Sequence, residues 1–169
     1  MPHLLLPGFD GLYKPEKLSP RLLENLAQRV RAKKVFPWAT ARRNQYVIAE
    51  KSCQKLRYRA TSLLSGAFVG LNDVTLRTDK IPGAVHYSVR YWLWAGYCIG
   101  LGLVIAAAIL GSTALFQFAG SKANYHAYPW VFWGSLLFWC FVWPWVLIAF
   151  HKIWARKMMV RLLDEVNRE

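Results

Sequence analysis

Charged side chains are missing from two long stretches of this 169-residue chain. No Asp, Glu, Lys or Arg occurs from Tyr91 to Ser121, and after Lys122 none occurs until Lys152. A proton relay, an ion pathway or a transporter of charged substrates requires ionisable groups inside its membrane-spanning segments. The missing charge therefore argues against these three classes of membrane function.

Cysteine and histidine are also scarce, and their three and four copies lack the spacing of a zinc site or a disulfide framework. A P-loop and a glycine-rich dinucleotide turn are absent too. We therefore expect no enzyme, no metal and no cofactor, apart from bound anionic phospholipid. His126 and His151 fit solvated or capping positions, with a headgroup or a quinone as the alternative ligand. The residues concerned are Cys53, Cys98, Cys140, His3, His86, His126 and His151.

The two uncharged runs have the length of transmembrane helices. A hydrocarbon core of ~30 Å is crossed by about 20 apolar residues that rise ~1.5 Å each. The sequence predicts spans at about 91–118 and 129–150. Burial in a soluble core is the alternative, but a chain this short has too little other material to cover two such helices.

Basic residues flank the outer ends of both predicted spans. Cations close to a span are retained on the side of synthesis, so both termini are expected on the matrix or cytoplasmic side. The turn GSKANYHAYP then lies on the opposite side, with Lys122 as its single Lys or Arg. The flanking cations are Arg77, Lys80, Arg90, Lys152, Arg156, Lys157 and Arg161.

Tryptophan and tyrosine gather near the ends of the predicted spans, where a ring can be apolar on one side and meet water on the other. Trp139 is different, because it lies near the middle of the second span. We expect its indole N–H against a protein carbonyl, a lipid or a cofactor, with a tolerated apolar ring as the alternative. The expected interface residues are Trp92, Trp94, Tyr125, Tyr128, Trp130, Trp133, Trp143, Trp145, Trp154, Lys152, Arg156 and Lys157.

Pro144 interrupts the second span. It has no N–H and its ring crowds the preceding turn, so the carbonyl of Cys140 loses its helical partner. A kink is predicted there, either as a hinge or as the ordinary accommodation of proline in a membrane helix.

Small residues recur along one face of the first span and begin with a GxxxG unit, which allows another helix to approach closely. The partner is either the second span or a helix of another chain. The residues predicted to pack there are Gly96, Gly100, Ala107, Gly111 and Ala114.

The ninety residues before the first span carry sixteen of the 22 Lys and Arg residues against six acids. No signal peptide is expected, because MPHLLLPGFDG has no basic leader and too short an apolar run. A helix is predicted in SPRLLENLAQRVRAKKVF, with Ser19 as N-cap, Pro20 first, and an apolar stripe of Leu22, Leu23, Leu26 and Val30. A second is predicted from about Thr40 to Gly70, on a seam of Tyr46, Ala49, Cys53, Leu56, Ala60, Leu63, Ala67 and Gly70. The run NDVTLRTDKIPGAVHYS is predicted to be a connector.

Together these segments predict an all-α membrane protein, a two-span helical hairpin preceded by basic amphipathic helices. The expected divisions are a basic arm at 1–90, the hairpin at 91–150 and a basic helical tail at 151–169. Its partners would be anionic lipids such as cardiolipin and acidic surfaces of other subunits. Nucleic acid is not favoured, since no zinc-finger or RNP-type motif is present.

This layout resembles, in outline, that of the small accessory subunits around the catalytic cores of respiratory complexes and ATP synthases. It also resembles two-span accessory proteins of bacterial secretion, conjugation and polysaccharide-export systems. The resemblance implies a non-catalytic subunit that anchors and stabilises an inner-membrane assembly, in mitochondria or, alternatively, in a bacterium. The competing hypothesis is an independent oligomeric effector or pore that associates through the GxxxG face.

Overall fold

The chain divides into two compact units. The computed structural model describes residues 7–36, 40, 44–62, 70–118 and 129–169, with the backbone alone at 113–118, 129 and 131. One unit, which we call the head domain, combines Met1–Trp94 with His151–Glu169, and the other, the hairpin, is Ala95–Phe150. The hairpin is therefore an insertion between two segments that fold together.

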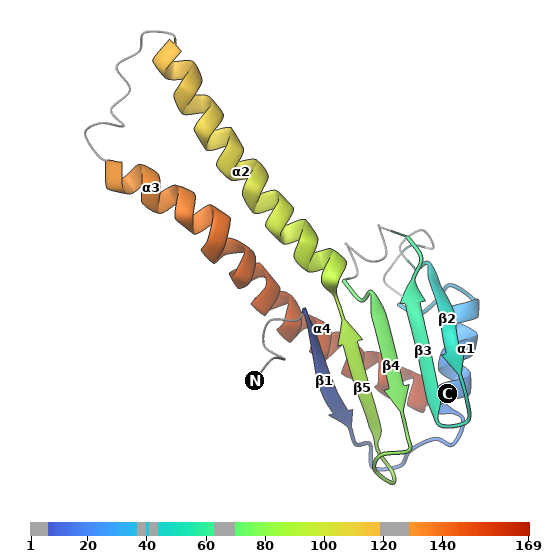
Figure 1. The fold of residues 1–169 in the computed structure, drawn as a ribbon. Coiled ribbons are helices and arrows are strands. Elements are labelled where there is room, and N and C mark those ends of the chain that lie inside the picture. Colours follow the sequence, from blue (N-terminus) through green and yellow to red (C-terminus); the bar gives the residue numbers. More distant parts are fainter. Residues whose placement is uncertain (1–6, 37–39, 41–43, 63–69, 119–128) are drawn as a thin grey trace. The chain divides into compact units, whose positions relative to one another are not determined.

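Five antiparallel strands form the sheet of the head domain, in the order β1-β5-β4-β3-β2 (Figure 1). Strands β2 to β5 follow one another as a meander, while β1 pairs with β5 at the far edge. The connection from β1 to β2 must therefore pass from one edge of the sheet to the other, and it carries helix α1. The strands are β1 Gly8–Tyr13, β2 Tyr46–Lys51, β3 Lys55–Ala60, β4 Asp73–Arg77 and β5 Val85–Arg90.

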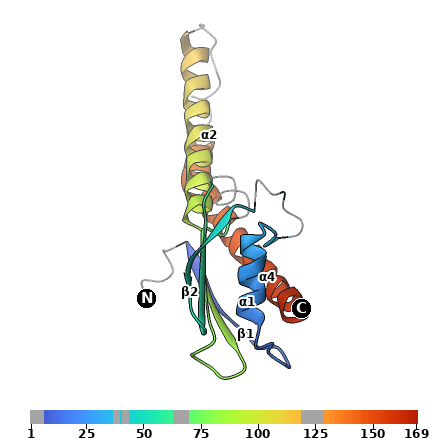
Figure 2. The same ribbon diagram turned by 90° about the vertical axis from the view of Figure 1, so that its right-hand side faces the viewer.

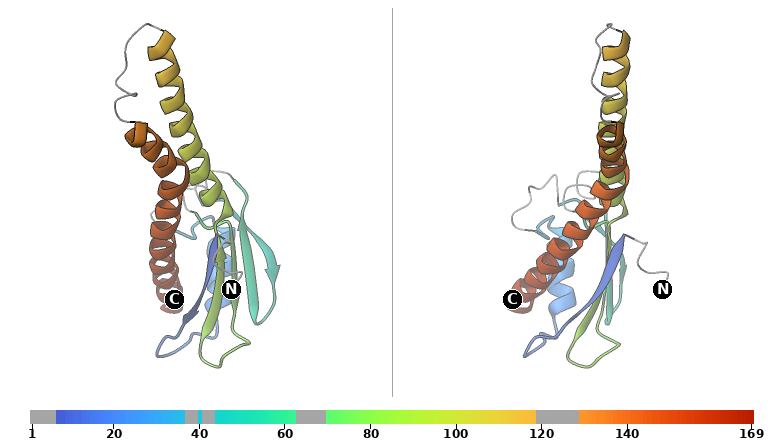
Figure 3. Two further views of the ribbon diagram at one scale, coloured as in Figure 1. Left: turned by 60° about the vertical axis from the view of Figure 1, so that its left-hand side comes forward. Right: turned by 90° about the vertical axis from the view of Figure 1, so that its left-hand side faces the viewer.

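Two helices cover one face of this sheet, namely α1 (Leu22–Arg31) and the C-terminal part of α4 (Trp143–Asn167) (Figures 2 and 3). Apolar residues alternate along the strands and point toward these helices. The helices turn their own apolar stripes to the same layer. The side chains at the centre of this core include Leu26, Leu56, Tyr58, Leu76, Tyr87, Met159 and Leu163.

Polar contacts hold the C-terminal segment against the N-terminal one. The Tyr13 hydroxyl donates to Asp164 Oδ1 at 2.7 Å, and the backbone N–H of Ser19 donates to Asn167 Oδ1 at 2.8 Å. Arg29 of α1 forms ion pairs with Glu165 and Glu169. Burial, together with the hydrogen bond to Asp164, raises the pKa of Tyr13 to about 12.

The hairpin consists of α2 (Trp92–Phe118) and a returning arm made of α3 (Pro129–Leu137), the π-helical segment η4 (Phe138–Val142) and the start of α4. The arms approach closely at Gly102. A Cβ built there would lie 2.6 Å from the Trp139 carbonyl oxygen and 3.0 Å from Pro144 Cγ. Only glycine fits at this crossing, since a side chain would separate the two backbones.

The prediction of an all-α protein is wrong, because the structure is mixed α/β with a five-stranded sheet. The region predicted as a helix from Thr40 to Gly70 contains β2 and β3, and the predicted connector contains β4 and β5. The helix predicted from Thr40 to Gly70 depended on a seam of small residues. In the predicted connector, an alternation of period two was the stronger signal, and it is seen in Val85, Tyr87 and Val89 of β5.

The helix predicted after Ser19 is confirmed as α1, and its apolar stripe is buried as expected. Its start differs from the prediction, because the N-cap is Arg21 and no side chain caps the helix. The Ser19 carbonyl, rather than its hydroxyl, accepts the N–H of Leu22 at 3.2 Å.

Truncation of the α1 stripe tests this core. Leu26 is fully buried, so Leu26→Ala should lower the free energy of unfolding by about 2–5 kcal/mol. Leu12→Ala is the control, because Leu12 is 40% exposed, and its cost should stay below about 1 kcal/mol. Urea unfolding of the full chain in detergent measures both, and equal losses would contradict the core described.

Candidate functional site

Large apolar side chains cover the surface of the hairpin. Trp130, Val104 and Phe150 are 73%, 66% and 67% exposed. Two helices, Trp92–Ser112 and Phe132–Asn167, are long and apolar enough to cross a membrane by length and composition. An apolar surface of this extent marks a site of interaction with lipid or with another protein.

The tryptophans predicted for the interface fall into two groups. Trp92, Trp133 and Trp145 are 58%, 57% and 52% exposed, and Trp130 is more exposed still. Trp94 and Trp143 are half-buried, and each packs against another ring. The predicted cations Lys152, Arg156 and Lys157 are exposed on α4, while Tyr125 and Tyr128 lie outside the described residues.

The predicted small-residue face is open. Gly96, Gly100, Ala107 and Gly111 are exposed, and the side chain of Ala114 lies outside the part described. A Cβ built at any of the three glycines meets no described atom within 4 Å. Among the described residues, the returning arm therefore does not fill this face.

A different set of small residues is buried on α2, and the sequence reasoning missed it. Their spacing of three, four and four residues places them on one side of a helix, but the set that begins with Gly96 and Gly100 has a similar spacing, so the sequence does not distinguish the two faces. Gly102 belongs to this set and meets the returning arm. The buried residues are Ala95, Cys98, Gly102 and Ala106.

Helical geometry changes at the site predicted for a kink. The π-helical segment Phe138–Val142 ends two residues before Pro144, and such segments accompany bends in helices. The ring of Trp139 lies 5.4 Å from that of Trp143 in an edge-to-face arrangement. The Trp139 carbonyl is the atom that approaches Gly102, so this irregular turn shapes the crossing of the two arms.

A cluster around His151 joins the two segments of the head domain that flank the hairpin in sequence. His151 is 6% exposed, and its Nε2 lies 3.1 Å from the carbonyl oxygen of Gly70. Because a carbonyl only accepts, Nε2 carries the proton and donates it. The rings of Trp94 and Tyr91 lie 4.7 and 5.2 Å from the imidazole. One histidine thus contacts the start of α2 and the loop before β4.

A second contact fixes the first turn of α2. The side chain of Asn72 accepts the backbone N–H of Leu93 at 2.9 Å, so it satisfies one of the free donors at the beginning of the helix. This contact and the His151 cluster both hold residues of the head domain next to the hairpin against the loop before β4.

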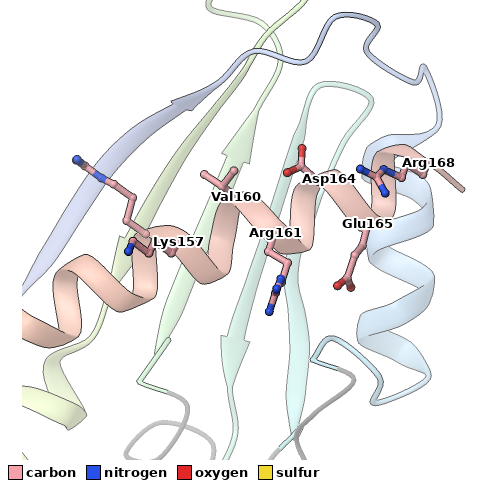
Figure 4. A pocket seen from close by; sticks show the side chains of 7 residues that line it. Lys157, Val160, Arg161, Asp164, Glu165 and Arg168 are labelled. Carbon is pink, nitrogen blue, oxygen red and sulfur yellow. The ribbon is translucent and has the colours of Figure 1, made fainter.

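Basic side chains line a shallow groove on the outer side of α4 (Figure 4). Both acids in the groove are already engaged, Asp164 with Tyr13 and Glu165 with Arg29. The cations are therefore available to a phosphate-bearing anion. The groove is formed by Arg156, Lys157, Val160, Arg161, Asp164, Glu165 and Arg168.

Reactive side chains do not converge in the part of the chain that the structure describes. No group of three His, Cys, Asp or Glu side chains there could hold a metal ion. Cys53 is exposed, Cys98 is buried and Cys140 is half-buried, and all three are free thiols. What the described residues offer is surfaces for binding: the apolar hairpin and the basic groove.

Two glycine substitutions isolate the role of His151. Gly70 and Gly83 both have φ +71°, so alanine at either position carries the same backbone strain of about 1–2 kcal/mol. A Cβ at Gly70 would also lie 2.1 Å from His151 Cε1, whereas one at Gly83 meets nothing within 4 Å. Gly70→Ala should therefore lose about 1–3 kcal/mol more stability than Gly83→Ala. Thermal unfolding in detergent compares them, and equal losses would contradict the contact.

No protein-family model, curated protein or solved structure matches this chain. The function that follows is therefore inferred from the chemistry and geometry of the chain itself.

Proposed function

We propose that this chain is a non-catalytic accessory subunit of a large inner-membrane complex, which it anchors and stabilises through its hairpin while its head domain binds neighbouring subunits and anionic lipid. One observation carries the proposal: a hairpin whose two helical arms carry no charged side chain is inserted between two segments of a single folded domain. A folded domain cannot be threaded through a bilayer, so both ends of the hairpin must lie on one side of it.

The charges beside the hairpin support this orientation. Arg90 precedes the first arm, and Lys152, Arg156 and Lys157 follow the second. Cations close to spans are retained on the cytoplasmic or matrix side. The head domain therefore lies on that side, and only the short segment between the arms crosses.

Two features of the hairpin favour a partner within the membrane. Large rings such as Phe141 and Trp133 are exposed, at 63% and 57%, so two helices do not cover each other. The face with Gly96 and Gly100 is also open, and small residues are the usual contact of helices in lipid. Helices of a larger assembly would cover both surfaces.

The basic groove supports the lipid part of the proposal. Helix α4 continues without a break past Phe150, the last residue of the predicted span. Lys152, Arg156 and Lys157 then lie about 3, 9 and 10 Å further along the helix axis, at ~1.5 Å per residue. Headgroup layers extend about 5–7 Å beyond the hydrocarbon on each side. Lys152 therefore lies within the headgroup layer, and the long side chains of Arg156 and Lys157 can extend back to it, so that each contributes ~1 kcal/mol on binding anionic phosphates.

Cardiolipin is the anionic lipid that we propose for this groove, because its two phosphates match a groove with several cations. The mitochondrial inner membrane is the compartment we propose, with a bacterial inner membrane as the alternative. Both place the basic head domain on the matrix or cytoplasmic side.

The topology predicts which cysteines an impermeant reagent reaches. With Cys98→Ala and Cys140→Ala in the background, exposed Cys53 of the head domain should be labelled by a membrane-impermeant maleimide from one side only. With Cys53→Ser added, a cysteine placed at Ala123 should be labelled from the other side only. Labelling of sealed and opened vesicles measures this, and the same side for both would refute the hairpin topology.

Assembly is tested by extraction of native membranes with a mild detergent, followed by a native gel. The 19.5 kDa chain should migrate in a complex several times its own mass. A free monomer at native abundance would refute the accessory role. Homo-oligomers formed by the purified chain alone, with leakage from vesicles, would identify the competing oligomeric effector.

A further inference from the structure

The second face of the head-domain sheet is not covered by any described helix, since α1 and α4 lie on the same side (Figure 2). Residues that alternate with the buried ones along β3, β4 and β5 point to this face, and they are polar. We call it the outer sheet face and define it by Lys55, Arg57, Thr75, Arg77, Ser88 and Arg90.

Positive charge exceeds negative charge on this face. The outward positions of the five strands hold five cations, the four of the definition and Arg59, against three carboxylates, Asp10, Glu50 and Asp73. Two of the carboxylates are committed within the chain. Glu50 accepts hydrogen bonds from Lys55, while Asp73 binds Arg57 in a bidentate manner and also meets Arg59.

These pairs keep Asp73 ionised. Burial acts to raise the pKa of Asp73, but the hydrogen bonds and charges of Arg57 and Arg59 outweigh burial and lower it. Arg77 and Arg90 have no carboxylate partner among the described residues. Two guanidinium groups therefore remain available on the outer sheet face.

Like charges also face one another across the strands. Lys55 lies opposite Arg77. Directly opposed residues on one face are about 5 Å apart, and like charges in such positions destabilise a sheet. Thr75 and Ser88 form the next cross-strand pair and add two hydroxyl donors. An external anion would relieve the repulsion and use these donors.

The shape of the face indicates the class of ligand. No Phe, Tyr or Trp occupies an outward position on the five strands, so bases of single-stranded nucleic acid would find no ring to stack on. The side chain of Arg90 lies along the surface of the sheet next to Gly8, because a Cβ built at Gly8 would be 2.8 Å from the Cδ atom of Arg90. Five strands at ~4.8 Å spacing give a surface about 19 Å wide. A level surface of this width suits another protein rather than a small anion.

A lipid surface fits the outer sheet face less well. His86 and Arg77 lie at the end of the sheet opposite to the end where β5 runs into α2, since His86 precedes Tyr91 by five residues. At ~3.3 Å per residue this is up to about 17 Å of extended chain, whereas the headgroup layer is about 5–7 Å thick. The basic groove of α4, by contrast, begins at Arg156, about 9 Å along the helix after Phe150.

We propose that the outer sheet face docks an acidic segment of a neighbouring protein subunit, whose carboxylates pair with Arg77 and Arg90 and accept hydrogen bonds from Thr75 and Ser88. This inference rests on the proposed function, because it assumes that the chain belongs to an assembly. It assigns the protein contact to the sheet and the lipid contact to α4.

Site-directed crosslinking tests the docking in native membranes. The full chain carries photoreactive benzoylphenylalanine in place of Ser88, and the adduct is identified by mass spectrometry. The expected product is a crosslink to a polypeptide, within a segment rich in Asp and Glu. In the variant Arg77→Glu/Arg90→Glu the yield should fall at least fivefold, whereas the control Lys14→Glu/Lys17→Glu, at two exposed positions outside both basic surfaces, should keep it. An adduct to phospholipid or nucleic acid, or no adduct, overturns the proposal.

A defined probe tests the same face without its partner. A 20-residue polyglutamate peptide is titrated against the full chain in phosphatidylcholine nanodiscs at low salt. Binding should weaken about tenfold in Arg77→Glu/Arg90→Glu and less than threefold in Lys157→Glu/Arg161→Glu. Equal weakening in both variants overturns the docking surface. If the chain migrates in an intact complex on the native gel but gives no adduct at Ser88, only the docking surface is refuted. If the chain is a free monomer but binds the peptide through Arg77 and Arg90, only the accessory role is refuted.

Discussion

The return of the chain to the head domain is the constraint on which the remaining structure depends. The core of this domain needs the segment after His151, because Met159 and Leu163 are buried against the sheet. The hydrogen bond from Tyr13 to Asp164 and the ion pairs of Arg29 join segments more than 130 residues apart in sequence. Because the segments on both sides of the hairpin belong to one folded domain, the apolar hairpin must leave this domain and return to it as a closed loop.

The hairpin is thus best regarded as a long loop of a folded domain, and its residues follow from that role. The contacts of His151 with Gly70 and of Asn72 with Leu93 hold residues of the head domain next to the hairpin against the loop before β4. Gly102 determines how closely the arms approach, because the carbonyl of Trp139 occupies the space of a side chain. Glycine at 96 and 100 meets no such neighbour, so small residues on α2 serve a contact within the chain on one side and leave a surface open on another.

Three surfaces of different chemistry result from this arrangement. The arms of the hairpin are apolar, the outer side of α4 is basic directly beyond the last apolar turn, and the outer sheet face combines cations with hydroxyl groups. The formal net charge of +13 arises from 22 Lys and Arg residues against nine Asp and Glu residues. Some of these cations pair with Asp73, Glu50, Glu165 or Glu169, and others lie in the basic groove of α4 and on the outer sheet face, where an anionic partner can reach them.

The sequence by itself determined the features that depend on neighbours along one helix: the two uncharged helical runs, the buried stripe of α1, and the departure from α-helical geometry next to Pro144. These are set within a few residues by the 3.6-residue period and by the missing proline N–H. The tertiary fold was needed to show that Phe9 and Val89 lie on paired strands, since β1 and β5 join by hydrogen bonds although they are far apart in the sequence. The tertiary fold also decided which small residues of α2 are buried. Gly96 and Gly102 are equivalent in the sequence, and they differ only because the returning arm packs against Gly102.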